Sequence, residues 1–321
     1  MVDAPRDAEA TRHERYEQLI AAAQKQPAIK VAVAHPCDEA SMRGVGEAMR
    51  LRLIEPILVG PVERIRRAAG EVGLDIGGVE LVGAEHSHAS AAKAVELVRA
   101  GKAEALMKGS LHTDELMGAV VSGATGIRTE RRISHCFIMD VPGHPDPLII
   151  TDAAVNIAPD LDAKVDIIQN AIDLAHAMGA EQVRVAILSA METVTTKVPS
   201  TIEAAALCKM AERGQITGAV LDGPLALDNA ISPEAAAIKK IASPVAGRAN
   251  ILVVPDLEAG NMLAKSLSFL AKADAAGIVL GARVPVILTS RADSLISRLA
   301  SCAVADMIAV AKRKAAAATI R

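Results

Sequence analysis

Residues 288–294 (LTSRADS) bring together the side chains with the clearest chemical use in this sequence. The apolar run at 286–288 predicts a strand, and the apolar spacing after residue 294 predicts a long helix. Ser290 and Arg291 would therefore lie where the strand meets the helix. A guanidinium binds two phosphate oxygens at once, and the amides at a helix start also attract anions. We predict an anion-binding site here, with a surface salt bridge as the simpler explanation for Arg291.

Two further loops follow predicted strands and carry polar residues. Residues 222–228 (DGPLALD) come directly after an apolar run, so Asp222 and Gly223 lie where a ligand could approach the backbone. Residues 255–261 (PDLEAGN) follow another apolar run and open a helix that Asp256 could cap. The same helix start could instead bind an anion, and the pattern supports the two interpretations about equally.

Apolar runs of strand length alternate with helical patterns along both halves of the chain. Neighbouring parallel strands need a long crossover connection, so this alternation predicts an α/β architecture with mostly parallel sheets. The predicted strands are 29–34, 57–59, 79–82, 105–107, 133–140, 148–151, 183–188, 219–221, 251–254, 277–279 and 286–288, and the predicted helices are 14–24, 39–53, 62–72, 89–99, 162–178, 200–213, 257–270 and 294–314.

The alternation breaks once, at residues 133–151, where two apolar runs flank a segment with three prolines. Proline excludes a helix there, so we predict a hairpin and a domain boundary. The length of 321 residues also favours two domains. We expect two doubly wound α/β domains, residues 1–143 with 295–321 and residues 144–294, and an active site in the cleft between them.

The common cofactor signatures do not occur in this sequence, which contains neither a GxGxxG fingerprint nor a P-loop. His86 and His88 lack a third ligand in view, so we predict no metal site. A formal net charge of −3 and a near absence of aromatic residues argue against a nucleic-acid partner. The four cysteines form no CxxC pair, and no secretory signal or long apolar run occurs, so we expect a cytoplasmic protein without a membrane partner.

The polar motifs together resemble those of the phosphate acetyl/butyryltransferase family. Four segments occur in the family's order and with similar spacing: 222–228, 243–250 (SPVAGRAN), 255–261 and 288–294. The resemblance continues through 107–109 (MKG), 126–129 (GIRT), 151–156 (TDAAVN) and 198–201 (VPST), so it covers nearly all of residues 30–300. It implies a two-domain α/β fold similar to that of isocitrate and isopropylmalate dehydrogenases, and a homodimer.

The activity that the resemblance implies is transfer of a short acyl group, acetyl or butyryl, between coenzyme A and inorganic phosphate. Coenzyme A, acyl-CoA and phosphate are then substrates, and no tightly bound cofactor is expected. By this resemblance Arg291 would hold phosphate charge, Ser290 would bond the acyl group or the thiol, and Asp293 would be a nearby candidate base. The implied substrate-binding residues are Arg128, Thr129, Asp222, Gly223, Asp256, Gly260 and Asn261.

The sequence departs from the acetyltransferase pattern at three places. Ser297 stands where the acetyltransferases carry an aspartate that would take the thiol proton, and Ala153 stands where they carry a cysteine. Residues 116–118 (LMG) lack the arginine that the family has in that helix, and Arg128 is the nearest replacement. Details of 126–129, 198–201 and 289–294 look more like the butyryltransferase branch, so the length of the acyl chain stays open.

Two other functions compete with the acyltransferase. The first is a metal-dependent dehydrogenase or decarboxylase, because one fold can carry several reactions. The second is a non-catalytic sensor that binds acyl-CoA, which the missing aspartate keeps in play. Turnover with acyl-CoA and phosphate separates the enzyme from the sensor.

Overall fold

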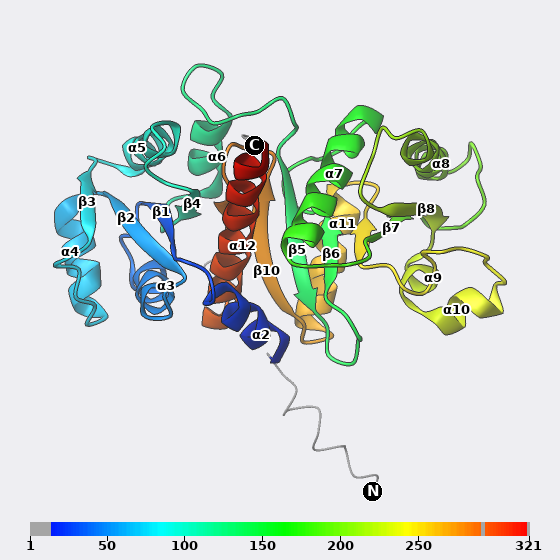
Figure 1. Ribbon diagram of the computed structural model, residues 1–321, viewed down its shortest axis with the longest axis horizontal. Coiled ribbons are helices and arrows are strands. Elements are labelled where there is room, and N and C mark those ends of the chain that lie inside the picture. The colour runs from blue at the N-terminus through cyan, green and yellow to red at the C-terminus, as the bar shows by residue number, and fades with distance from the viewer. Residues whose placement is uncertain (1–13, 290–292, 320–321) are drawn as a thin grey trace, which may run out of the picture. The chain divides into compact units, whose positions relative to one another are not determined.

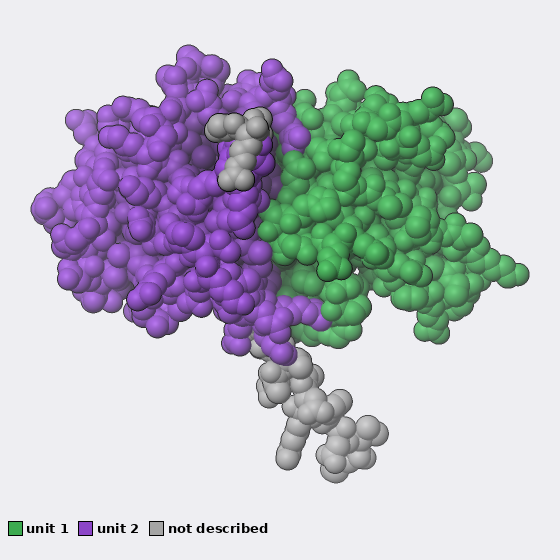
Figure 2. Space-filling view, viewed as in Figure 1, with its two compact units in different colours: residues 1–12, 132–275 green, residues 13–131, 276–321 purple. Residues whose placement is uncertain are grey.

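The computed structural model describes residues 14–289 and 293–319. Their contacts divide the chain into two compact units, coloured separately in Figure 2. Unit 1 holds residues 132–275, and unit 2 holds residues 14–131 and 276–319 of the described chain. The last helix of the chain belongs to unit 2, with residues 14–131. The units divide at 131/132 and 275/276, whereas the predicted domains divide at 143/144 and 294/295.

Unit 2 is built on a mostly parallel sheet (Figure 1). Its strand order is β3-β2-β1-β4-β11-β10, in which only the β10–β11 pair is antiparallel. The strands are β1 (Ile29–Ala34), β2 (Ile54–Gly60), β3 (Glu80–Gly83), β4 (Ala105–Lys108), β10 (Asp274–Leu280) and β11 (Val286–Ile287). The inner strands β1 and β4 are buried almost throughout, which is why they consist of continuous apolar runs.

Helices cross between these strands in two groups. The chain passes from β1 to β2 and β3 on one side and then returns to β4 on the other, so right-handed crossovers put the connecting helices on opposite faces. One group packs in the order α4, α3, α12, α2, and α5 packs with α6 in the other. The helices are α2 (Glu14–Ala23), α3 (Glu39–Arg50), α4 (Val62–Glu71), α5 (Ser87–Arg99), α6 (Thr113–Val121) and α12 (Leu295–Thr319).

Unit 1 contains strands in the order β5-β6-β9-β7-β8. The predicted hairpin is confirmed, because β5 and β6 pair antiparallel across the proline-rich segment, and β6, β9, β7 and β8 then run parallel. The strands are β5 (Ser134–Asp140), β6 (Leu148–Thr151), β7 (Arg184–Leu188), β8 (Val220–Leu225) and β9 (Ile251–Val253), and the helices are α7 (Leu161–Ala177), α8 (Pro199–Glu212), α9 (Leu227–Ile231), α10 (Pro233–Ile238) and α11 (Leu257–Phe269).

The α/β class predicted from the sequence is therefore confirmed in both units. Helices α6, α9 and α10 were not predicted from the apolar pattern, and α9 and α10 are too short to show a helical period. The cores are aliphatic: of the three aromatic side chains in the chain, only Tyr16 is fully buried, and Phe269 is exposed. None of the helices in the described part of the chain is both long and apolar enough to cross a membrane.

One buried carboxyl group lies inside unit 2, on α12. Asp306 is 1% exposed, and no described residue hydrogen-bonds to either of its carboxylate oxygens. Burial raises the pKa of Asp306 to about 7; nearby Arg313 lowers this pKa and Glu104 raises it. Desolvation thus outweighs the attraction of the nearby cation, and the carboxyl stays protonated below neutral pH.

We expect Asp306 to make the stability of this protein depend on pH. In the unfolded chain an aspartate ionises near pH 4, whereas folded Asp306 keeps its proton up to about pH 7. The folded state binds more protons in this range, so the free energy of unfolding falls as pH rises from about 4 to about 7. Asp306→Asn should be more stable than the parent at pH 8 by about 1–3 kcal/mol and equal to it at about pH 4.

Urea unfolding of both proteins across this pH range measures the effect. Asp146→Asn, on the exposed loop between β5 and β6, is the matched control and should follow the parent curve. A constant difference between Asp306→Asn and the parent at every pH would show that Asp306 does not titrate in this range.

Candidate functional site

The loops after β1 and β4 approach each other closely at a glycine. A Cβ atom at Gly109 would lie 2.5 Å from the carbonyl oxygen of Ala34 and 2.6 Å from that of His35, so only glycine fits there. This contact explains why Gly109 follows β4 in the segment 107–109. The two loops meet at the carboxyl edge of the parallel strands, where ligands bind in open α/β sheets.

Hydrogen bonds join the same two loops. The backbone N–H and the hydroxyl of Ser110 both donate to the carbonyl oxygen of His35, at 2.9 and 2.8 Å. The N–H of Cys37 donates in turn to Ser110 Oγ at 3.3 Å. His35 has a φ of +58°, a left-handed conformation that histidine adopts more readily than most residues, and this turns the chain out of β1. The loop geometry is thus set by backbone contacts.

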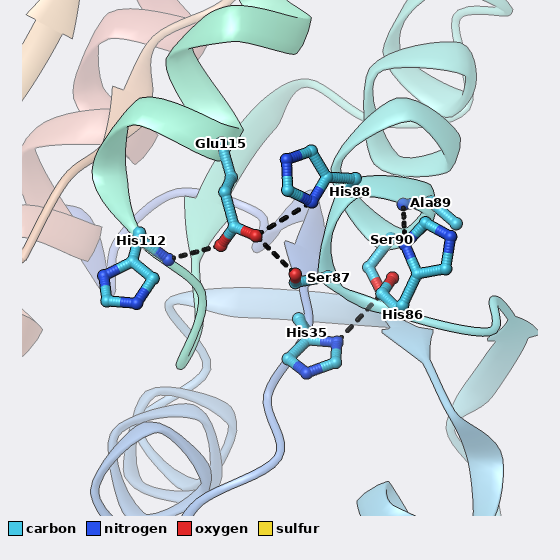
Figure 3. A network of polar contacts seen from close by, with 8 residues as sticks. All are labelled: His35, His86, Ser87, His88, Ala89, Ser90, His112 and Glu115. Carbon is cyan, nitrogen blue, oxygen red and sulfur yellow. Dashed lines mark hydrogen bonds and ion pairs between the residues drawn. The ribbon is translucent and has the colours of Figure 1, made fainter.

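A crevice of about 320 Å³ opens beside these loops, and Figure 3 shows its polar network. Glu115 on α6 accepts hydrogen bonds from Ser87 Oγ and from the N–H of His112, and it pairs with His88 at 3.0 Å. The crevice is lined by His35, Cys37, Asp38, Arg64, Ser87, Ser110, Leu111, His112 and Glu115. It therefore draws on the loops after β1 and β4 and on the first turns of α4, α5 and α6.

Burial and charge set the protonation of two groups in this crevice. Burial lowers the pKa of His35, and the nearby Arg64 lowers it further, while Glu115 and Asp38 act in the opposite direction. Burial also raises the pKa of the Cys37 thiol. At neutral pH the His35 ring is therefore neutral and Cys37 is a thiol.

The next strand along this edge is β11, which delivers the predicted anion-binding segment. Parallel pairing of Ile287 with Met107 places the chain that leaves β11 beside the chain that leaves β4. Ser290 and Arg291 themselves lie outside the described residues. The residue before them, Thr289, is buried and accepts a hydrogen bond from Arg298 at 3.3 Å.

Two buried cations lie at this part of the edge. Lys108, at the end of β4, donates from Nζ to the carbonyl oxygens of Gly109 and Leu111 at 3.4 and 3.2 Å. Arg298 lies on the buried side of α12, and Gly44 on α3 leaves room for it, because a Cβ there would come within 3.3 Å of Arg298 Cδ. Positive charge therefore accumulates where the segment 289–294 begins.

Two residues near the start of α12 bear on the general base. Asp293 is half-buried and lies two residues before the helix begins. Ser297 is buried, and its N–H and hydroxyl both bond to Ser294 Oγ, at 3.2 and 3.0 Å. Ser297 and Ser294 thus form a hydroxyl cap at the start of α12.

Arg128 and Thr129 lie at a different edge of the unit 2 sheet. Arg128 forms an antiparallel bridge with Ala282, and Thr129 Oγ1 donates to the carbonyl oxygen of Gly281 at 2.6 Å. Gly281 and Ala282 follow β10, which runs antiparallel to β11, so they lie beside the start of β11 and not beside its end. The backbone at 128–129 is therefore at the edge opposite to Thr289.

In unit 1, the motif 255–261 supports the loop after β6. Asp256 caps α11 by accepting a hydrogen bond from the N–H of Ala259 at 2.8 Å. A Cβ at Gly260 would lie 2.9 Å from Ala153 Cβ, and Asn261 donates to the carbonyl oxygen of Ala153 at 3.3 Å. Of the two interpretations of this motif, the structure shows the helix cap.

Asp152 organises that loop from within. Its buried carboxylate accepts hydrogen bonds from the backbone N–H groups of Ala154, Val155 and Asn156, at 2.9, 3.0 and 3.1 Å, and from the Asn156 side chain at 2.6 Å. Nearby His135 is fully buried, and burial lowers its pKa to about 4, so the ring is neutral at working pH. The segment 151–156 is therefore a rigid loop built around one carboxylate.

Asp222 and Gly223 lie within β8, away from the loop after β6. Strands β9 and β7 separate β8 from β6, and the Asp222 carboxylate accepts a hydrogen bond from the N–H of Gly223 at 2.8 Å. A Cβ at Gly223 would come within 2.7 Å of the Ile187 carbonyl oxygen, so close packing of β8 on β7 requires glycine. Close packing of the two strands therefore explains the glycine of this motif.

Sequence analysis missed most of the crevice. Four of its residues come from three separate segments: the loop after β1 with His35, α4 with Arg64, and the connection after β4 with Ser110 and Glu115. None belongs to a motif that predicts a site. The one available signal was the position of His35 directly after a buried strand. Burial raises the pKa of all four cysteine thiols, to about 12 for Cys136, Cys208 and Cys302, so thiolate chemistry is disfavoured at these cysteines.

Comparison with known proteins assigns the family. The family described as Phosphate acetyl/butaryl transferase matches residues 85–305. The chain is 66% identical to a phosphate acetyltransferase of Rhizobium meliloti over 95% of this chain and 97% of the relative, and 40% identical to a phosphate butyryltransferase of Clostridium beijerinckii over 92% and 97%. A crystal structure of a branched-chain phosphotransacylase from Enterococcus faecalis is similar with a TM-score of 0.77 and 31% identity, over 88% of this chain and 99% of that one. The chain belongs to the phosphate acetyl/butyryltransferase family.

The contact at Gly109 gives a direct test of the loop geometry. Gly109→Ala places a methyl group against two carbonyl oxygens, so it should destabilise unit 2 by about 1–3 kcal/mol and displace the loops after β1 and β4. Thermal unfolding and the rate of any enzymatic turnover measure the two effects.

Gly118→Ala is the matched control, because no atom lies within 4 Å of a Cβ at that exposed position of α6. It should be neutral or stabilising by up to about 1 kcal/mol. Equal stability of the Gly109 and Gly118 variants would contradict the close contact.

Proposed function

We propose that this protein transfers a short acyl group between coenzyme A and inorganic phosphate. The observation that carries the proposal is family membership over residues 85–305 together with high identity to a phosphate acetyltransferase. The reaction is attack of the coenzyme A thiolate on an acyl phosphate, which releases phosphate, or the reverse attack of phosphate on an acyl-CoA, which releases the thiol.

The carboxyl edge of unit 2 has the charge that this reaction needs. Lys108 and Arg298 are buried cations beside the end of β4 and the end of β11, and Arg291 adds a third positive charge in the segment between Thr289 and Asp293. A preorganised positive site lowers the energy of bound phosphate and of the oxyanion that forms on the acyl oxygen when the acyl carbon is attacked. We assign phosphate binding to Arg291 and a hydrogen bond to the acyl group or thiol to Ser290.

The thiol proton must go to a base or to water. Ser297 is bonded to Ser294 and cannot act as a carboxylate would, so the family's usual position supplies no base here. Asp293 is the nearest carboxylate before α12. A thiolate formed through a pKa lowered by Arg291 is the alternative.

The remaining substrate-binding assignments follow the family motifs. Asp222, Gly223, Asp256, Gly260 and Asn261 are proposed to bind or to shape the site for coenzyme A and phosphate. Arg128 and Thr129 belong to a family motif too, but their backbone lies at the edge opposite to Thr289, so the site proposed here does not include them. Asp256, Gly260 and Asn261 would act by holding the loop 152–156. We also propose that no cofactor is tightly bound. We propose that the enzyme works in the cytoplasm, where coenzyme A is available and the four cysteines of the protein stay reduced.

The direct test measures thiol released from acetyl-, propionyl- and butyryl-CoA with and without phosphate. Phosphate-dependent release is expected, and it ranks the acyl chains. The higher identity is with an acetyltransferase, whereas motifs 126–129 and 198–201 favour butyryl, so the ranking decides between them. Coenzyme A binding without release would favour the sensor, and hydride transfer to a nicotinamide cofactor would favour a dehydrogenase.

Arg291→Ala tests the phosphate assignment. Loss of a charged hydrogen-bond donor should raise the KM for phosphate by about 10- to 100-fold and lower kcat, while the unfolding curve stays unchanged. Arg283→Ala is the control, because Arg283 is exposed and follows β10 near the opposite edge of the sheet. Unchanged phosphate kinetics in Arg291→Ala would remove Arg291 from the site.

We further propose that the protein is a homodimer and that α11 supplies its interface. Met262, Phe269 and Leu270 are 62%, 71% and 82% exposed, and their spacing places them on one side of α11 and its end. Ile157, also exposed, lies at the start of this helix, since its carbonyl oxygen accepts a hydrogen bond from Leu257. An apolar patch of this kind is typical of a protein interface, and a second copy of the chain is the partner that the family resemblance implies.

Phe269→Asp should convert the dimer to a monomer, because it puts a charge into an apolar interface. Sedimentation velocity should show the mass fall from about twice 33.3 kDa to 33.3 kDa. Ile238→Asp, at an equally exposed apolar residue on α10, should leave the dimer intact. A parent protein that is already monomeric, or a dimer in both variants, would contradict the assignment to α11.

A further inference from the structure

The crevice between the ends of β1 and β4 is lined by residues to which the proposed acyl transfer assigns no role. It lies at the switch point of the sheet, since the chain leaves β1 toward β2 on one side and arrives at β4 on the other. This is the position at which open α/β sheets bind ligands. Its volume of about 320 Å³ is at the lower end of the range for small-molecule sites and exceeds what a phosphate ion alone would fill.

The two carboxylates of the crevice are already engaged with the protein. Asp38 accepts a hydrogen bond from the N–H of Ser41 at 2.8 Å, which caps α3. Glu115 is bonded to Ser87, His88 and His112, as Figure 3 shows. Their negative charge is therefore compensated locally by helix N-termini and donors.

Arg64 on α4 is in the opposite situation. It is exposed at the crevice, and within the described chain no hydrogen bond or ion pair engages its guanidinium. Its charge lowers the pKa of both His35 and Cys37, so it lies close to the crevice floor. By contrast, Arg66 on the same helix pairs with Glu63 at 2.9 Å. Helix α4 also begins after Pro61 without a side-chain cap, which adds uncompensated donors at this edge.

His35 can respond to an anion by taking up a proton. Ser90 Oγ donates its hydrogen to the carbonyl oxygen of His86 at 2.8 Å, so it must accept from His35 Nδ1 at 3.0 Å. The neutral ring therefore carries its proton on Nδ1, and Nε2 has a lone pair with no hydrogen-bond partner among the described residues. The groups whose charges act on His35 come from every neighbouring helix start: Arg64, Glu115, Asp38 and His86.

We propose that this crevice binds a phosphorylated organic anion, with Arg64 as its counter-charge and His35 Nε2 as a donor that is protonated on binding. The phosphate can belong to the nucleotide end of coenzyme A or to a separate small molecule. A bound anion stabilises the imidazolium, so one proton is taken up and the affinity rises as pH falls from about 8 to about 6. The proposal concerns ligand binding and does not depend on the acyl-transfer reaction.

Calorimetric titration with adenosine 3′,5′-bisphosphate and with ribose 5-phosphate tests the proposal. Titrations at about pH 6 and about pH 8, in two buffers of different ionisation enthalpy, measure the proton uptake. At least one probe should bind the parent, and Arg64→Gln should weaken its binding at least about tenfold, which is the loss of one charged contact. Arg66→Gln is the matched control and should bind like the parent, and His35→Asn should abolish the proton uptake.

The two sources of phosphate give different results. If the site takes the nucleotide end of coenzyme A, the bisphosphate competes with coenzyme A and Arg64→Gln raises the KM for coenzyme A. If it takes a separate ligand, ribose 5-phosphate binds without such competition. Absence of binding by both probes, or equal binding by the Arg64 and Arg66 variants, would overturn the proposal. A parent protein that fails to release thiol with phosphate would refute the proposed function and leave these binding results standing.

Discussion

The close approach of the loops after β1 and β4 is the constraint on which the carboxyl edge of unit 2 depends. Gly109 leaves no room for a side chain between its own Cα and two carbonyl oxygens, and Ser110 then bonds one of those oxygens twice. This contact positions His35 and the crevice on one side. On the other side, parallel pairing of β4 with β11 brings in Thr289 and the segment that carries Ser290 and Arg291. The two sites that we propose would therefore share one sheet edge.

Negative and positive side chains at this edge are placed differently. Carboxylates at the helix starts are bonded to backbone amides or to neighbouring donors, as with Asp38 and Glu115. Cations are buried beside the strand ends, as with Lys108 and Arg298, or are exposed with no ion pair to a described residue, as with Arg64. Because the negative groups are bonded locally and Lys108, Arg298 and Arg64 bring positive charge to this edge, we expect the edge to favour anions. That preference suits a reaction between phosphate and a phosphorylated cofactor.

Much of this architecture could be predicted from the sequence, because buried strands such as Ile29–Ala34 are continuous apolar runs and the prolines at 141–147 mark the hairpin. The site was predictable only where residues cluster in motifs. Sequence alone could not decide whether Asp256 caps a helix or marks an anion site. The answer depends on the backbone conformation at Asp256, which lets its carboxylate reach the N–H of Ala259. Sequence alone also missed the crevice, because His35, Arg64, Ser110 and Glu115 meet only when the crossovers from β1 to β2, β3 and β4 have folded. Arg128 is adjacent to no strand end in the sequence, and its backbone lies opposite to Thr289.

Hydrogen–deuterium exchange of the full chain with and without coenzyme A and phosphate tests the central claim most directly, namely that ligands bind at the carboxyl edge of unit 2. Protection is expected in the backbone amides of residues 35–38, 109–112 and 289–294. Residues 121–130, at the opposite edge, should exchange at the same rate in both states. Protection confined to 121–130, with none in the loops after β1, β4 and β11, would contradict this account.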